Sequence, residues 1–235
     1  MDGHTKKIPY SIGMYALDKS VQWIMVYGKA LVGATLEIIN AFHDIPPGEL
    51  KGRSNRHLQR QKIFEQIISS YNTQPFEGLP AQSLTDALNI SKLTSQSHKE
   101  STSKNMTFAV ALECFVAACA LAIGFTKPIR INELSTILRD SLSYQTNNEG
   151  AFIRQPILKK RVPIAPNIRR PIPYIASVAI QLLAVLGNGL KEIYKDTSPH
   201  SEHLFYFPSS RGFNKPSGKR VDSRIDNAMR SFCDI

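Results

Sequence analysis

The chain has 235 residues, and its 29 Lys and Arg against 19 Asp and Glu give a formal net charge of +10. Hydrophobic residues make up 42% and charged residues 20%, a composition that excludes a disordered tail and is typical of a folded globular protein. This length fits one large domain or two small ones. For a basic soluble protein, nucleic acid is the leading partner.

Three cysteines, Cys114, Cys119 and Cys233, form an odd set without metal-ligand spacing, and we interpret them as reduced thiols in a cytosolic protein. Residues 1–7 are polar and begin no secretory-signal pattern. The longest apolar stretch, residues 108–125, contains Glu113, which favours a core helix over a membrane span. We therefore expect a cytoplasmic, nucleoid-associated protein that does not bind a membrane.

The first part of the chain is predicted to be helical. Apolar residues at three- and four-residue steps over 15–42 predict one long helix or two stacked ones, and residues 44–48 end it. A second helix is predicted over 51–71. Its first turns are basic, with Arg53, Arg56, Arg60 and Lys62. A solvent-exposed helix face without a ligand has the same pattern.

Residues 73–105 are rich in Ser, Thr, Gln and Asn, and we interpret them as a linker or loop with a short helix over 83–88. The predicted division is therefore a helical region over 1–72, this linker, and a third region over 106–235. A helix over 106–123, ended by Gly124, opens the third region, and a helical turn over 130–138 follows.

Two short strands are predicted over 152–158 and 168–172, joined by a basic turn that contains prolines. A helix over 174–190, an extended piece over 203–207 and a last helix from Val221 complete the pattern. The predicted fold class is mainly α with a small β-hairpin or three-stranded sheet.

Arg130 and Glu133 stand three residues apart at the start of the predicted helical turn, so their side chains lie on one face. On spacing alone this is an ordinary surface ion pair. The surrounding order is more specific: an apolar helix, Arg130-Ile131-Asn132-Glu133-Leu134, a basic two-strand element, a helix, and Leu204-Phe205-Tyr206-Phe207-Pro208. Over residues 106–235 this order resembles the catalytic domain of the tyrosine recombinase (phage integrase) family.

The resemblance implies roles for four residues. Arg130 would be the first catalytic arginine, whose planar guanidinium binds the scissile phosphate, and Glu133 would orient it and support the local fold. Lys159 or Lys160 would be the hairpin lysine that protonates the leaving 5′-oxygen. The turn departs from the family's usual small residues, so the choice between the two lysines stays open. A second alternative also stays open, namely that this basic turn is only exposed to solvent and has no catalytic role.

Cations without compensating acids gather in one stretch. Residues 151–173 contain no Asp or Glu, and phosphate contacts explain such a run best. The cations in this stretch that we expect to bind DNA are Arg154, Arg161, Arg169 and Arg170, and the resemblance adds Lys219 and Arg220 before the last helix.

The family pattern continues into a His-x-x-Arg box and a nucleophilic Tyr, and neither follows residue 212 in this sequence. We therefore expect DNA binding in site-specific recombination or integration by a C-terminally incomplete recombinase without strand cleavage of its own. The alternative is a non-catalytic DNA-binding regulator or accessory protein of a mobile element. Double-stranded DNA is the expected partner, with further recombinase protomers. We expect no cofactor and no metal, because phosphotyrosine chemistry needs neither and the histidines are scattered.

Overall fold

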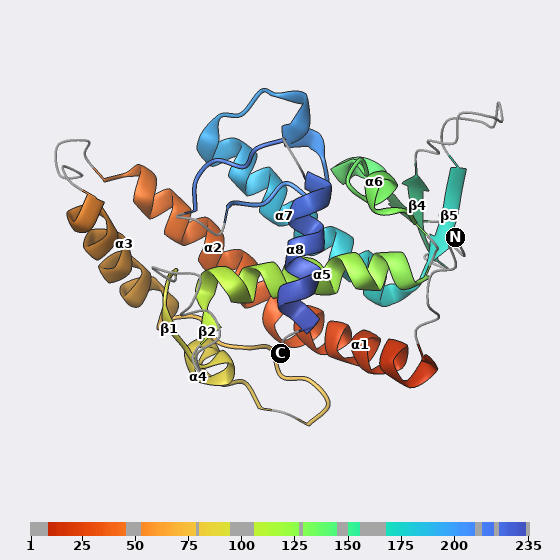
Figure 1. Cartoon of the computed structure of the whole chain (residues 1–235), viewed down its shortest axis with the longest axis horizontal. Helices are drawn as coiled ribbons and strands as arrows, with labels where there is room; N and C mark the ends of the chain where they lie inside the picture. Colours follow the sequence, from red (N-terminus) through yellow and green to blue (C-terminus); the bar gives the residue numbers. More distant parts are fainter. Residues whose placement is uncertain are drawn as a thin grey trace, which may run out of the picture.

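The computed structural model is mainly helical, with one sheet of two strands and one of three (Figure 1). This confirms the predicted class, including the three-stranded alternative. The residues that the structure describes are 9–45, 53–78, 80–94, 106–126, 129–144, 150–155, 168–209, 213–218 and 221–233.

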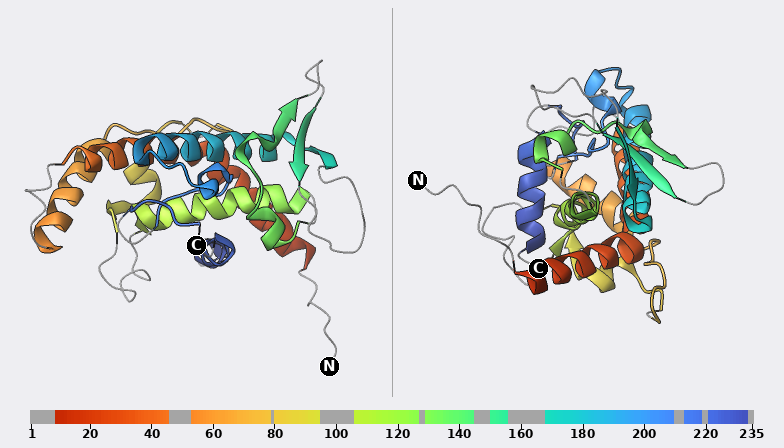
Figure 2. Two further views of the ribbon diagram at one scale, coloured as in Figure 1. Left: turned by 90° about the horizontal axis from the view of Figure 1, so that it is seen from above. Right: turned by 90° about the vertical axis from the view of Figure 1, so that its right-hand side faces the viewer.

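Helix α5 (Phe108–Thr126) lies at the centre of the molecule, and Figure 2 shows other helices around it. Phe115, Val116, Ala117 and Ala118 are consecutive and so point in different directions around α5, yet each is buried. A helix that is apolar all round is stable only when neighbours cover every side. The neighbours are α1 (Tyr10–Gln22), α2 (Gly28–His43), α7 (Tyr174–Tyr194) and α8 (Val221–Cys233).

Two sequence predictions for this region have different outcomes. Cys114 and Cys119 are buried and form no disulfide among the described residues, while their reduced state in the cytosol stays a prediction. The prediction that Gly124 ends the helix is wrong, since α5 continues to Thr126. An internal glycine costs a helix about 1 kcal/mol, which the packing of the buried face outweighs.

Helices α1 and α2 form one continuous helical stretch with a π-helical segment, η1 (Trp23–Tyr27), between them. The predicted helix over 15–42 is thus confirmed. A π segment disturbs the regular ladder of backbone hydrogen bonds. Here the carbonyl of Val26 accepts a hydrogen bond from the backbone N–H of Gln74 at 2.9 Å, so a distant segment satisfies it.

Gly28 allows α2, α5 and α7 to approach one another closely. A Cβ at this position would lie 2.8 Å from Leu182 Cδ1 and 2.9 Å from Phe115 Cε2. Only a residue without a side chain fits such a contact without moving its neighbours. The glycine therefore belongs to the helix packing rather than to a turn.

Helix α3 (Arg53–Ile68) confirms the second predicted helix, and α4 (Leu84–Leu88) confirms the short one. The segment after α4 differs from the expected exposed loop. Strand β1 (Ile90–Lys92) pairs in parallel with β2 (Met106–Thr107), and Leu93 is only 4% exposed. One apolar residue within a polar stretch is too weak a pattern to predict a strand.

The β-sheet that follows α5 lies at one end of the molecule (Figure 1). Its order is β3 (Leu142–Tyr144), β4 (Ala151–Gln155), β5 (Ile168–Ile172), and both pairings are antiparallel. Before it come α6 (Ile131–Leu134), which is shorter than predicted, and the 3₁₀ segment η3 (Arg139–Ser141). Leu134 and Ile137 are buried, whereas Leu138 is 45% exposed.

The C-terminal part packs against α5. Leu204, Phe205, Tyr206 and Phe207 are all buried, and they follow the 3₁₀ segment η4 (Pro199–Glu202). They form no strand, although His203 makes an isolated bridge to Leu138. Helix α8 confirms the last predicted helix, and its buried residues Ile225, Ala228 and Phe232 lie on one face.

Within the described ranges, three helical stretches are long and apolar enough to cross a membrane, by length and composition alone: Tyr10–His43, Phe108–Phe125 and Tyr174–Tyr194. In the fold, 72% of the most apolar of them, Phe108–Phe125, is buried against other elements. The apolar character of α5 is therefore accounted for by its central position. One buried apolar cluster joins residues from both ends of the chain, from Trp23 to Phe232.

Candidate nucleic-acid interface

The strand register decides which residues share a face of the three-stranded sheet. Ile153 is fully buried, and Ala151 and Ile172, which pair with each other, are also buried. Side chains alternate along a strand, so Phe152 and Arg154 lie on the opposite, outer face. Arg169 pairs directly with Arg154 on that face.

Neutral contacts position the two paired arginines. One Nη atom of Arg169 donates to the Ser143 hydroxyl at 3.2 Å, and its guanidinium lies 5.3 Å from the centre of the Phe152 ring. One Nη atom of Arg154 donates to the backbone carbonyl of Asp140 at 3.1 Å. A guanidinium has five N–H donors, so both side chains keep donors for a further acceptor.

No carboxylate forms a salt bridge with Arg154 or Arg169 within the described part of the chain. Like charges directly opposite each other on a sheet face destabilise the strand pair by about 0.2–1 kcal/mol. Both side chains are exposed. The outer face is therefore a positively charged surface whose repulsion an anionic ligand would relieve.

Arg170 occupies a different place from the two outer arginines. It pairs with Ile153 and so belongs to the inner face, where it is half-buried. The structure thus brings together two of the four cations predicted in 151–173. Arg161 and the candidate hairpin lysines Lys159 and Lys160 lie outside the described residues, as do Lys219 and Arg220.

Arg130 is the N-cap residue of α6, in an extended conformation, and it is exposed. The Glu133 carboxylate accepts a hydrogen bond from the backbone N–H of Arg130 at 3.2 Å. This contact satisfies an N–H that α6 leaves without a helical partner. Glu133 thus supports the local fold through the backbone of Arg130. That Glu133 also orients the Arg130 guanidinium stays a prediction. Segment η3 joins α6 to β3, so a short piece of chain links Arg130 to the sheet.

Two arginines have internal partners that sequence reasoning did not predict. Arg139, only 8% exposed, forms a salt bridge with Glu202 at 3.2 Å and packs against Gly187. Burial lowers the pKa of Arg139, while Glu202 acts in the opposite direction. Arg224 donates at 2.7 Å to the carbonyl oxygens of both Phe207 and Pro208. No local sequence pattern predicts these partners, because they lie 16 to 63 residues away along the chain.

The other C-terminal cations within the described residues are also paired. Lys215 lies 3.0 Å from an Asp196 oxygen, and Arg230 lies 2.9 Å from Asp226 one turn earlier in α8. Asp196 is almost fully buried, and it also accepts a 2.7 Å hydrogen bond from the Tyr206 hydroxyl. Together with Arg224, these contacts show that much of the C-terminal positive charge has partners within the fold.

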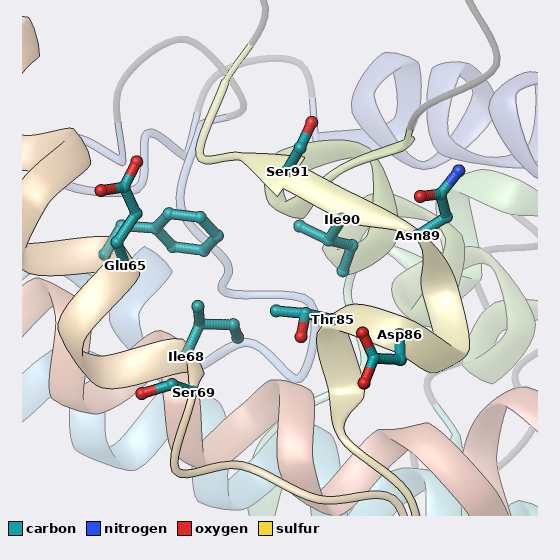
Figure 3. Close-up of a pocket in the computed structure, with 9 residues that line it drawn as sticks. Glu65, Ile68, Ser69, Thr85, Asp86, Asn89, Ile90 and Ser91 are labelled. Carbon is teal, nitrogen blue, oxygen red and sulfur yellow. The ribbon is translucent and has the colours of Figure 1, made fainter.

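A pocket of about 520 Å³ lies between α3 and the α4–β1 segment (Figure 3). Phe64, Ile68 and Ile90 give it an apolar lining, and the carboxylates of Glu65 and Asp86 stand at its edge. Two carboxylates repel phosphate, so this pocket is not a nucleic-acid site. The described part of the chain contains no group of three or more His, Cys, Asp or Glu that could hold a metal ion.

The positively charged surface of Arg154 and Arg169 is therefore the candidate interface, with Arg130 linked to it along the chain. Comparison with protein-family models, with curated proteins and with solved structures found no match.

Proposed function

We propose that this chain binds double-stranded DNA in site-specific recombination or integration, as a relative of the tyrosine recombinases. The observation that carries DNA binding is the direct pairing of Arg154 with Arg169 on the exposed face of the sheet. The repulsion of this pair is relieved when each guanidinium binds a phosphate of the DNA backbone. Counterion release from the DNA then adds to affinity.

The net charge of the chain supports the same partner. Lys and Arg outnumber Asp and Glu by ten. Duplex DNA has one negative charge per roughly 1.7 Å of its axis, so neighbouring arginines can each find a phosphate. Double-stranded DNA is therefore a better partner for this surface than a single small anion. A DNA-binding protein of this kind would work in the cytoplasm, at the nucleoid.

The recombination part of the proposal rests on the sequence resemblance and on the exposure of Arg130. An arginine that clamps a scissile phosphate must reach outwards, and the N-cap position of α6 leaves Arg130 exposed. No His-x-x-Arg box and no further Tyr follow residue 212 in the sequence. For residues 1–235 we therefore propose DNA engagement without strand cleavage.

Fluorescence anisotropy with a labelled duplex tests DNA binding. The double variant Arg154→Gln/Arg169→Gln should weaken binding by about tenfold or more, because charge-assisted contacts to phosphate are lost. The matched control Lys62→Gln/Lys92→Gln removes two exposed cations from α3 and β1. It should stay within about twofold of the wild type. Equal weakening in both double variants would reject the sheet as the interface.

The alternative function is that of a DNA-binding regulator or accessory protein of a mobile element. Arg130→Ala separates the two proposals when binding is compared between a cognate recombination site and unrelated duplex. A recombinase relative should lose preference for its site, because Arg130 would act at one particular phosphate. In a regulator, the same variant should weaken both duplexes equally, as loss of any phosphate contact does.

A further inference from the structure

A second pocket, of about 280 Å³, lies near the C-terminal end of α7, where α2, α3 and residues 213–215 meet. Helix α7 has 21 residues and begins directly after β5, so about 30 Å separates this pocket from the sheet. The pocket is thus distinct from the candidate interface. None of the residues that line it is acidic.

Three basic side chains from three separate segments line this pocket: His43 from α2, Arg60 from α3 and Lys215 from the 213–215 segment. The guanidinium of Arg60 lies 4.8 Å from the centre of the buried Phe42 ring. Burial lowers the pKa of Arg60, and the nearby positive charge of Arg56 adds to this effect. Both effects mean that the positive charge of Arg60 is unfavourable for the free protein at this position.

Contacts around the pocket position the other two basic groups. The His43 ring packs edge-on against the Tyr194 ring, with centres 5.1 Å apart. The Lys215 ammonium contacts Asp196 at 3.0 Å, which uses one of its three donors and leaves two for another acceptor. Asp196 itself is not part of the lining.

The backbone before Lys215 adopts a conformation that bulky residues rarely take. Phe213 has a φ of +53°, its ring stacks on Phe108 at 5.8 Å, and its carbonyl accepts a 2.8 Å hydrogen bond from Tyr194. Such strain persists only when surrounding contacts fix it. Here the buried ring and the Tyr194 hydroxyl hold the chain so that Lys215 lines the pocket.

We propose that this pocket binds one phosphate group, through Arg60, Lys215 and His43. Arg60 and Lys215 supply charge-assisted donors from two segments, as is typical of phosphate recognition, and the His43 ring adds a further N–H donor. The volume exceeds the share of a single water, about 30 Å³, by enough to hold a tetrahedral oxyanion with several waters. The phosphate belongs either to the DNA backbone or to a small phosphomonoester.

Isothermal titration calorimetry with inorganic phosphate at low ionic strength tests the site. Wild-type protein should bind phosphate saturably with one-to-one stoichiometry, and Arg60→Gln should weaken binding about tenfold or more. The matched control is Lys62→Gln, which removes an exposed cation from the same helix. It should change the affinity by less than about twofold, because a two-residue step turns away from the pocket. Circular dichroism establishes that the variants fold, and Lys215→Gln replaces Arg60→Gln if the latter does not.

Absence of saturable phosphate binding, or equal weakening by Arg60→Gln and Lys62→Gln, would overturn the proposal. A duplex titration of Arg60→Gln then identifies the source of the phosphate. Weaker duplex binding assigns the site to the DNA backbone, whereas unchanged duplex binding assigns it to a phosphomonoester. This test of the pocket is independent of the test of DNA binding at the sheet, because Arg154→Gln/Arg169→Gln should leave the phosphate affinity of the pocket unchanged.

Discussion

Arg154 lies directly opposite Arg169 across the antiparallel β4–β5 pair, and no salt bridge within the described residues neutralises either side chain. Such a pair costs the free protein stability. The two arginines therefore serve ligand binding rather than the stability of the free protein, and measurements of unfolding test this.

Arg154→Gln should therefore leave the free energy of unfolding unchanged or raise it by up to about 1 kcal/mol, as like-charge repulsion is relieved. Gln still has N–H donors to offer the Asp140 carbonyl. Urea unfolding at low salt measures the difference. A loss above 1 kcal/mol would instead mean that Arg154 is a structural residue.

Two glycine-to-alanine changes separate helix propensity from packing. Gly187→Ala places a Cβ 2.8 Å from Arg139 Cδ, so it should cost about 1–3 kcal/mol of stability by overpacking. Gly124→Ala meets nothing within 4 Å in α5 and should gain up to about 1 kcal/mol. Thermal unfolding compares the two. Similar shifts of both variants would contradict the close contact between α7 and Arg139.

Two arginines on α8 should differ in their contribution to stability. Arg224 donates to two carbonyl oxygens and lies 4.1 Å from the centre of the Phe207 ring, whereas Arg230 has a single exposed ion pair. Arg224→Ala should therefore lower the free energy of unfolding by about 2 kcal/mol. Arg230→Ala should lower it by less than about 0.5 kcal/mol. Denaturant titrations of both variants check this order, and equal losses would refute it.

Asp196 should make stability depend on pH in the acid range. Its pKa is held well below the usual value by the hydrogen bond from Tyr206, with the N–H of Ser198 and the Lys215 ammonium adding to the effect. A carboxyl whose pKa is lower in the folded state stabilises the protein above its unfolded pKa, about 3.9. That stabilisation is lost as pH falls towards the folded pKa.

Asp196→Asn should therefore cost about 2 kcal/mol at pH 7, and the difference from the wild type should shrink below about pH 4. Asp18→Asn is the control, because Asp18 is exposed on α1. Urea unfolding at pH 7 and pH 3 provides the measurement. A difference between wild type and Asp196→Asn that is the same at both pH values would show that the carboxylate charge contributes nothing.

Apolar periodicity predicted the long helices, because burial of one face at three- and four-residue steps leaves a clear pattern over 15–42 and 174–190. The strand pair was predicted from short β-like runs. Its register was not, since residues 156–167 are too long a connection for turn chemistry to specify which residues pair. The cross-strand pairing of Arg154 with Arg169 therefore needed the structure.

The sequence also does not predict which residues pair with the buried polar side chains. An arginine in a basic chain predicts a surface cation, but Arg139 reaches Glu202, 63 residues later, and Arg224 reaches the carbonyl of Phe207. Each partner is a matter of tertiary packing rather than of local pattern. The same holds for the pocket of His43, Arg60 and Lys215, whose members come from three segments.

The salt dependence of duplex binding tests the central claim most directly. Plotting the logarithm of the binding constant against the logarithm of salt concentration should give a steep negative slope for the wild type. Arg154→Gln/Arg169→Gln should make that slope shallower by about 1.8, because each phosphate contact contributes about 0.9. A slope that this double variant leaves unchanged, or a wild type whose binding does not depend on salt, would contradict the account.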